Sequence, residues 1–308
     1  MKKNILFYFF ILSFVFVSTF TLTISWGLQN PTRFFQRESV LAKTDSKEDL
    51  LEISPIPVFK DDGVLMSELT AQSVLAVDLD SGGILFEKDP FKPLLPASTT
   101  KIVTALVAMD YYPLSQILSV GKVTVDGQKM HLVPLEKITV ENLMYGLLVA
   151  SANDAAEVLA QNYQGGRQVF IEKMNRKIKN LGLKNTHFVN PSGLDEEGQV
   201  TTAIDLLKIA NYAMENPFFR KVVATKEIVV ESIDAHEKHR LTNINQLVGE
   251  VDGVLGVKTG WTENARENLV TYLERDGRRL MIVVLSSTDR FGETKALINW
   301  IFENYAWK

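Results

Sequence analysis

The chain has 308 residues, 46% of them hydrophobic, so it can bury one large core or two modest ones. Its net charge of −4 comes from acidic and basic residues mixed along the chain, which argues against a nucleic-acid partner. The lack of cysteine excludes disulfides, thiolate catalysis and cysteine-ligated metal centres.

The N-terminus carries a long apolar stretch. Lys2 and Lys3 precede residues 5–28, which contain no charged side chain. As a helix this stretch would be roughly 36 Å long, enough to cross a hydrocarbon core of ~30 Å. No Ala-x-Ala cleavage site follows, and Trp26 stands where an interfacial aromatic would anchor a span. We expect residues 1–28 to form an uncleaved membrane anchor in preference to a cleaved signal peptide, with the remainder outside the cytoplasmic membrane or, after cleavage, secreted.

Residues 29–68 show no sustained period and include Pro55 and Pro57. This composition predicts a tether between the anchor and a folded domain over residues 69–308. Within that domain, period and turn signals predict strands at 73–79, 84–87, 227–232, 254–259, 269–273 and 280–285. Helices are expected from about residue 98 through 109 and at 140–150, 155–163, 168–181, 202–214 and 291–307. Strands at both ends with helices between them predict an α+β fold with one sheet.

Ser98 and Lys101 lie at the start of the first predicted helix, which is apolar almost all round from residue 102 to 109. Residues three apart share a helix face, so the lysine amine could take a proton from the serine hydroxyl. If Ser98 only capped the helix, Glu or Gln would be favoured in place of Lys101. The second Ser-x-x-Lys, Ser119 to Lys122, contains a glycine and is interpreted as a strand-start serine and a loop lysine.

Two further short motifs follow in the chain. Ser151-Ala-Asn153 interrupts two predicted helices, and Lys258-Thr259-Gly260 ends a predicted strand. Alone, the first could be a turn with helix caps and the second a strand entering a turn.

Together and in this order, the three motifs are those of penicillin-binding proteins and class A β-lactamases. The chain resembles the serine D-alanyl-D-alanine carboxypeptidases, the low-molecular-mass penicillin-binding proteins, also over residues 97–104, 148–156, 187–194 and 253–262. This resemblance implies the β-lactamase/DD-peptidase-like fold, with an antiparallel sheet from both chain ends, flanking helices and a helical insertion. It makes residues 69–308 the catalytic domain.

The resemblance also implies a role for each catalytic residue. Ser98 would be the nucleophile, and Lys101 its base when neutral. Burial, the helix N-terminus and the charge of Lys258 all lower the pKa of such a lysine. Ser151 would pass the proton to the leaving amine, and Asn153 would bind the substrate amide.

On the substrate side, Lys258 and Thr259 would hold the free C-terminal carboxylate. Gly260 would let an extended substrate lie close to the strand edge. Backbone N–H groups of Ser98 and Trp261 would form the oxyanion hole.

We therefore expect a membrane-tethered enzyme that removes the terminal D-alanine from peptidoglycan stem peptides through an acyl-enzyme. The same geometry would let β-lactams acylate Ser98. No metal or organic cofactor is implied.

Several positions need separate interpretation. Arg266 stands where the family usually has glycine, and it would add a cation or narrow the rim. Gln199, frequently histidine in relatives, is interpreted as peripheral. Asp154 is expected to be a helix N-cap. Residues 190–193 are expected to form a loop that shapes the site.

Three alternatives remain open. A β-lactamase would need a deacylating glutamate; Glu196 and Glu197 lie in the right region, but the Glu-x-x-Leu-Asn pattern is missing. A metallopeptidase would use His236 and His239 as metal ligands. These histidines are three residues apart, unlike those of a His-Glu-x-x-His motif, so exposed loop histidines are the favoured interpretation. The third is a catalytically silent peptidoglycan-binding relative, against which the intact motifs argue.

Overall fold

The structure is a computed structural model that describes residues 55–308. The predicted anchor over residues 1–28 and the tether up to residue 54 lie outside the described residues, so both stay predictions. In the described part of the chain, no helix combines the length and apolar character that a membrane crossing needs.

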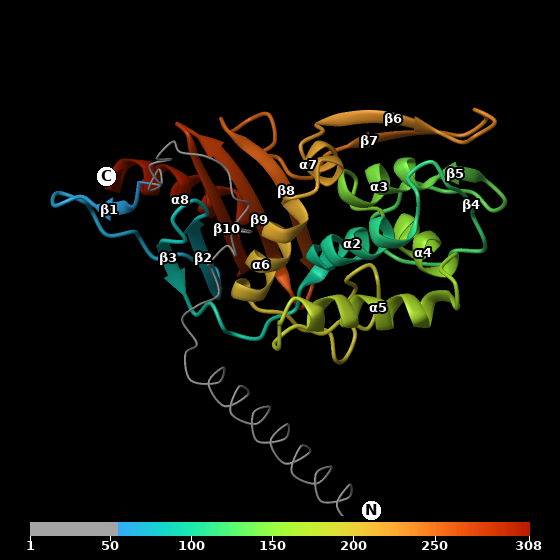
Figure 1. Ribbon diagram of the computed structural model, residues 1–308, viewed down its shortest axis with the longest axis horizontal. Coiled ribbons are helices and arrows are strands. Elements are labelled where there is room, and N and C mark those ends of the chain that lie inside the picture. Colours follow the sequence, from blue (N-terminus) through green and yellow to red (C-terminus); the bar gives the residue numbers. More distant parts are fainter. Residues whose placement is uncertain (1–54) are drawn as a thin grey trace, which may run out of the picture. The chain divides into compact units, whose positions relative to one another are not determined.

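A five-stranded sheet is the centre of the described region (Figure 1). Its strands, in spatial order, are β3 (Ile84–Lys88), β2 (Ser73–Asp78), β10 (Arg278–Ser287), β9 (Arg266–Arg275) and β8 (Val254–Thr262). All neighbouring strands are antiparallel. The sheet thus joins an early hairpin to the last three long strands, which confirms the predicted α+β arrangement from both chain ends.

Strand β10 shows why both faces of this sheet are covered. Leu280, Ile282 and Val284 contribute to one apolar core, and Met281 and Val283 contribute to the other. Because successive side chains of a strand point to opposite faces, a continuous apolar run requires cover on both sides. Helix α8 (Arg290–Asn304) belongs to the first core through Leu297, Ile298 and Ile301.

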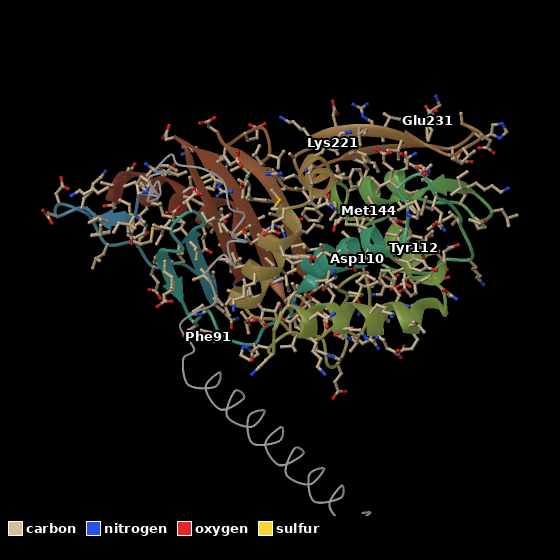
Figure 2. The ribbon with its side chains drawn as sticks, viewed as in Figure 1. Phe91, Asp110, Tyr112, Met144, Lys221 and Glu231 are labelled. Atoms are coloured by element: carbon tan, nitrogen blue, oxygen red, sulfur yellow. The ribbon has the colours of Figure 1, made fainter. Side chains whose placement is uncertain are left out.

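The second core continues into the helical half of the molecule. Its helices are α2 (Lys101–Tyr111), α3 (Val140–Leu148), α4 (Asn153–Gln161), α5 (Gly166–Asn180), α6 (Ala203–Met214) and α7 (Pro217–Val223). Residues 102–108 of the predicted apolar run 102–109 are buried in α2, and Met109 is partly buried. Figure 2 places Met144 of α3 and Tyr112, which follows α2, in this half. Helix α7 was not predicted, because seven residues are too few to show a helical period.

The C-terminal end differs from the prediction. Helix α8 ends at Asn304, and β11 (Tyr305–Trp307) pairs with β1 (Pro57–Phe59). Phe59 packs edge-on against Tyr305, with ring centroids 5.4 Å apart. Residues 57–59 of the predicted tether therefore lie against the end of the folded domain.

Two short pairs complete the fold: β4 (Ile117–Ser119) with β5 (Lys137–Thr139), and β6 (Glu227–Glu231) with β7 (Lys238–Thr242). One prediction was wrong at β7. His239 was expected to be an exposed loop residue, but it lies in β7 and is only 5% exposed. Its Nδ1 lies 2.8 Å from the carbonyl of Met130 and its Nε2 lies 2.8 Å from Glu136 Oε1. His236, in the turn before β7, is exposed as expected.

Candidate active site

Ser98 lies in η1 (Ala97–Thr100), a 3₁₀ turn that leads directly into α2. In a 3₁₀ turn, side chains three residues apart lie one above the other. Lys101 Nζ accordingly donates to Ser98 Oγ at 2.8 Å. Neither η1 nor α2 has a side-chain cap, so Ser98 is not serving as a helix cap.

Lys101 is fully buried at the start of α2. Burial lowers the pKa of its ammonium group from 10.5 to about 7, against the opposing charges of Asp154 and Glu157. Its Nζ also donates to the carbonyl of Ser192 at 2.6 Å. A neutral amine that gives a hydrogen to Ser192 can turn its lone pair toward Ser98, which is the orientation a base requires.

Ser151 and Lys258 form a second hydroxyl–amine pair. Lys258 Nζ donates to Ser151 Oγ at 2.8 Å and to the Thr259 carbonyl at 3.0 Å. Burial lowers the pKa of Lys258 well below its usual value, and the charges of Lys101 and Arg290 lower it further. Two buried lysines thus each hold one hydroxyl group.

Asn153 begins α4, and its side chain supports the loop before β5. Its Nδ2 donates to the carbonyl of Asp126 at 2.6 Å, and its backbone N–H donates to Gln128. Its Oδ1 is buried and has no hydrogen-bond partner among residues 55–308, so it can accept a bond from a ligand.

Asp154 is not the helix cap that was predicted, because its side chain holds a neighbouring loop. Its Oδ1 accepts from the backbone N–H of Met130 at 3.0 Å, and its Oδ2 accepts from Leu132 at 3.1 Å. A carboxylate that accepts from two backbone N–H groups of this loop supports residues 130–132.

Gly260 brings the edge strand β8 against the nucleophile turn. A Cβ at Gly260 would lie 3.0 Å from Ala97 Cβ, 3.1 Å from the Pro96 carbonyl and 3.2 Å from Ser98 N. Only glycine permits this approach without displacement of η1. Thr259 is buried next to Lys258 in the chain, whereas Trp261 is 63% exposed.

The loop over residues 190–193 touches η1 from another side. A Cβ at Gly193, whose φ is +86°, would lie 1.9 Å from the Ala97 carbonyl. Asn190 Oδ1 accepts from the Gly193 N–H at 2.7 Å and so holds the turn. Gln199 is not peripheral: it is buried, and its Oε1 accepts from Val189 N–H at 2.9 Å.

Two residues of this site were missed by sequence reasoning. Arg290 Nη1 donates to the Gly260 carbonyl at 2.7 Å, and burial lowers its pKa against the charge of Glu267. Asn268 Nδ2 donates to the Leu95 carbonyl at 2.9 Å and the Pro96 carbonyl at 3.0 Å. Neither residue belongs to a short motif, so the sequence carried no signal for either.

Other candidate residues are less involved. Glu196 and Glu197 are exposed, and Glu196 Oε2 accepts from Asn190 Nδ2 at 3.0 Å. Ser119 is the last residue of β4, not a strand start, and Lys122 is exposed in the loop that follows. Arg266 has a φ of +59°, a region that favours glycine. In residues 55–308 no three His, Asp or Glu side chains are placed to share a metal ion.

The profile of the D-alanyl-D-alanine carboxypeptidases, Peptidase_S11, matches residues 60–289. The chain belongs to this family. This confirms the prediction from the three motifs that the protein is a serine-type D-alanyl-D-alanine carboxypeptidase. No finding favours a β-lactamase.

Relatives in this family cover most of the chain. The D-alanyl-D-alanine carboxypeptidase DacF of Bacillus subtilis is 33% identical over 268 residues, 83% of this chain and 69% of its own. DacB2 of Mycobacterium tuberculosis is 35% identical over 242 residues, 75% of this chain and 82% of its own. The crystal structure of the Streptomyces K15 DD-transpeptidase superposes with a TM-score of 0.74 at 32% identity, covering 78% of this chain and 100% of that one. The likeness confirms the predicted DD-peptidase fold.

Proposed function

We propose that this D-alanyl-D-alanine carboxypeptidase removes the terminal D-alanine from peptidoglycan stem peptides through an acyl-enzyme on Ser98. The observation that carries this mechanism is Lys101, whose buried amine has a pKa of about 7 and lies 2.8 Å from Ser98 Oγ. A serine hydroxyl becomes a competent nucleophile when such a base is within hydrogen-bond reach.

In acylation, Ser98 Oγ attacks the carbonyl carbon of the penultimate D-alanine while its proton passes to the neutral amine of Lys101. The carbonyl oxygen becomes an oxyanion, which accepts from the backbone N–H groups of Ser98 and Trp261. The approach of Gly260 to η1 supports this arrangement, because it brings β8 within contact distance of Ser98 N.

The leaving amine takes a proton from Ser151, whose hydroxyl is held by Lys258. Ser151 in turn receives the proton that Lys101 took from Ser98, so the amine of Lys101 is neutral again. The C–N bond then breaks and free D-alanine departs. Water completes the cycle: it adds to the ester carbonyl while its proton passes to the neutral amine of Lys101, the bond between the acyl group and Ser98 Oγ breaks, and Lys101 returns the proton to Ser98.

Recognition of a free C-terminus would come from donors on β8 and from the guanidinium of Arg290, which holds the Gly260 carbonyl. Lys258 and Thr259 would bind the terminal carboxylate, whose negative charge would favour the ammonium form of Lys258 against the burial that lowers its pKa. Asn153 Oδ1, buried and without a partner among residues 55–308, would accept from the substrate amide. A β-lactam offers the same carboxylate and a strained amide carbonyl, so it would acylate Ser98 and block the enzyme.

The test is the intact mass of the full chain after incubation with a fluorescent penicillin. We expect one adduct in the parent and none in Ser98→Ala. Ser119→Ala is the matched control, because Ser119 belongs to the second Ser-x-x-Lys sequence and should leave labelling unchanged. An intact drug without adduct would favour a silent binding protein, and a hydrolysed drug without adduct would favour a β-lactamase.

We also propose that residues 1–28 hold the enzyme in the cell membrane with its catalytic domain outside the cytoplasm. The support is the uncharged length of residues 5–28 and the two lysines before it. Cell fractionation tests this: the full chain should sediment with membranes, and deletion of residues 1–28 should release it. Release of the full chain by high salt alone would contradict an apolar anchor.

A further inference from the structure

One exposed carboxylate ties the loop at residues 190–196 to the turn after β8. Asp195 Oδ1 accepts from Thr262 Oγ1 at 2.6 Å. Asp195 Oδ2 accepts from Asn264 Nδ2 at 3.0 Å and from its backbone N–H at 3.3 Å. We call these three residues the latch. Because three donors converge on one carboxylate, the loop and the turn are held together at this point.

The latch connects two segments that both touch the nucleophile turn. Gly193 lies against the Ala97 carbonyl, and Gly260 lies against Ser98 N. Asp195 and Thr262 each follow one of these glycines by two residues, a reach of about 7 Å in extended chain. The contacts of Gly193 and Gly260 with the nucleophile turn therefore both constrain where the latch lies relative to Ser98.

The direction of the substrate along β8 decides which part of the substrate faces the latch. This direction rests on the proposed function. The terminal carboxylate is placed at Lys258 and Thr259, and the reacting carbonyl at the N–H of Trp261. An extended substrate continues past Trp261 toward Thr262 with the residues that precede the reacting carbonyl. The latch is thus on the acyl side, opposite the leaving D-alanine.

We propose that the latch is a specificity-determining wall that limits the bulk of the acyl-side group. In a stem peptide this group is the residue before the D-Ala-D-Ala pair, and in a β-lactam it is the acylamino side chain. A compact group fits in front of the latch, beside the exposed Trp261. A bulky group must break the hydrogen bonds of Asp195 to gain room, and that cost lowers its rate of acylation.

The experiment compares two penicillins that share the nucleus and carboxylate and differ in the acylamino group. Acylation rates of the full chain by benzylpenicillin and by the bulkier piperacillin are measured in competition with a fluorescent penicillin. We expect the piperacillin-to-benzylpenicillin rate ratio to rise about tenfold in Asp195→Ala and in Thr262→Val. The second variant keeps the charge of Asp195 and removes the hydroxyl that donates to it at 2.6 Å and that accepts from the Ala265 N–H at 3.0 Å.

Glu197→Ala is the matched control, because Glu197 is an exposed acid two residues after Asp195 and outside the latch. Its ratio should equal that of the parent. A ratio unchanged within twofold in both latch variants would overturn the inference while an adduct in the parent still upholds the proposed function. An equal rise in Asp195→Ala and Glu197→Ala would also overturn it, since a general charge effect would then suffice. Absence of any adduct in the parent would overturn the proposed function and the inference with it.

Discussion

Replacement of Lys101 by methionine should stabilise the fold at neutral pH while it abolishes acylation. The ammonium pKa is 10.5 in the unfolded chain and about 7 in the folded protein, because burial disfavours the charged form. The unfolded chain therefore binds this proton more tightly. At pH 7 and below, burial of Lys101 therefore lowers the free energy of unfolding, and this penalty disappears as the pH rises through 10.5.

The magnitude follows from the two pKa values. Linkage makes the penalty about 4 kcal/mol at pH 7 and less than about 1 kcal/mol at pH 10. Methionine has a similar length and no charge, so it removes this penalty. It also leaves the Ser192 carbonyl without the donor at 2.6 Å, which costs about 1–3 kcal/mol at any pH. We expect Lys101→Met to be more stable than the parent at pH 7 and less stable at pH 10.

Urea unfolding of both proteins at the two pH values measures the difference directly. The stability difference between variant and parent should fall by about 3 kcal/mol from pH 7 to pH 10. Labelling by a fluorescent penicillin should drop by at least about 10²-fold in the variant, the usual contribution of a general base. A stability difference that is the same at both pH values would refute the depressed pKa, and normal labelling would refute the role as base.

Two further predictions follow from the same site. The rate of acylation should rise with pH as Lys101 loses its proton, with a midpoint near pH 7 and about a tenfold fall in rate per pH unit below it. The rate of labelling by a fluorescent penicillin between pH 5 and 8.5 checks this. A rate that does not change with pH would exclude Lys101 as the titrating base. Gly193→Ala should lower stability by about 1–3 kcal/mol and slow labelling, because its Cβ would meet the Ala97 carbonyl at 1.9 Å and its φ is +86°. Gly182→Ala is the control, since φ is +72° there but no atom lies within 4 Å, and equal losses of labelling in both variants would contradict the role of the contact with η1.

The sequence alone determined those features that depend only on residues close together along the chain, namely individual helices and strands and the pair of Ser98 and Lys101. Ser98 and Lys101 are three residues apart, so any helical turn brings them together, and the structure places them 2.8 Å apart. The strand signals at 269–273 and 280–285 and the apolar run at 102–109 likewise predicted elements that the structure contains as β9, β10 and α2. The three motifs in order were enough to identify the family.

Only the tertiary structure decided which distant groups complete the site. Arg290 reaches Gly260, Asn268 reaches Pro96, and the Ser192 carbonyl reaches Lys101 across 91 residues of chain. Such contacts depend on how β8, η1 and the loop pack together, and no spacing in the sequence records that packing. The same reason explains the errors at His239 and Gln199, whose polar side chains are buried because other segments satisfy their hydrogen bonds: Glu136, 103 residues away, for His239, and Val189, ten residues away, for Gln199. Even the pKa of Lys101 is a tertiary property, since its largest cause is burial by the surrounding elements.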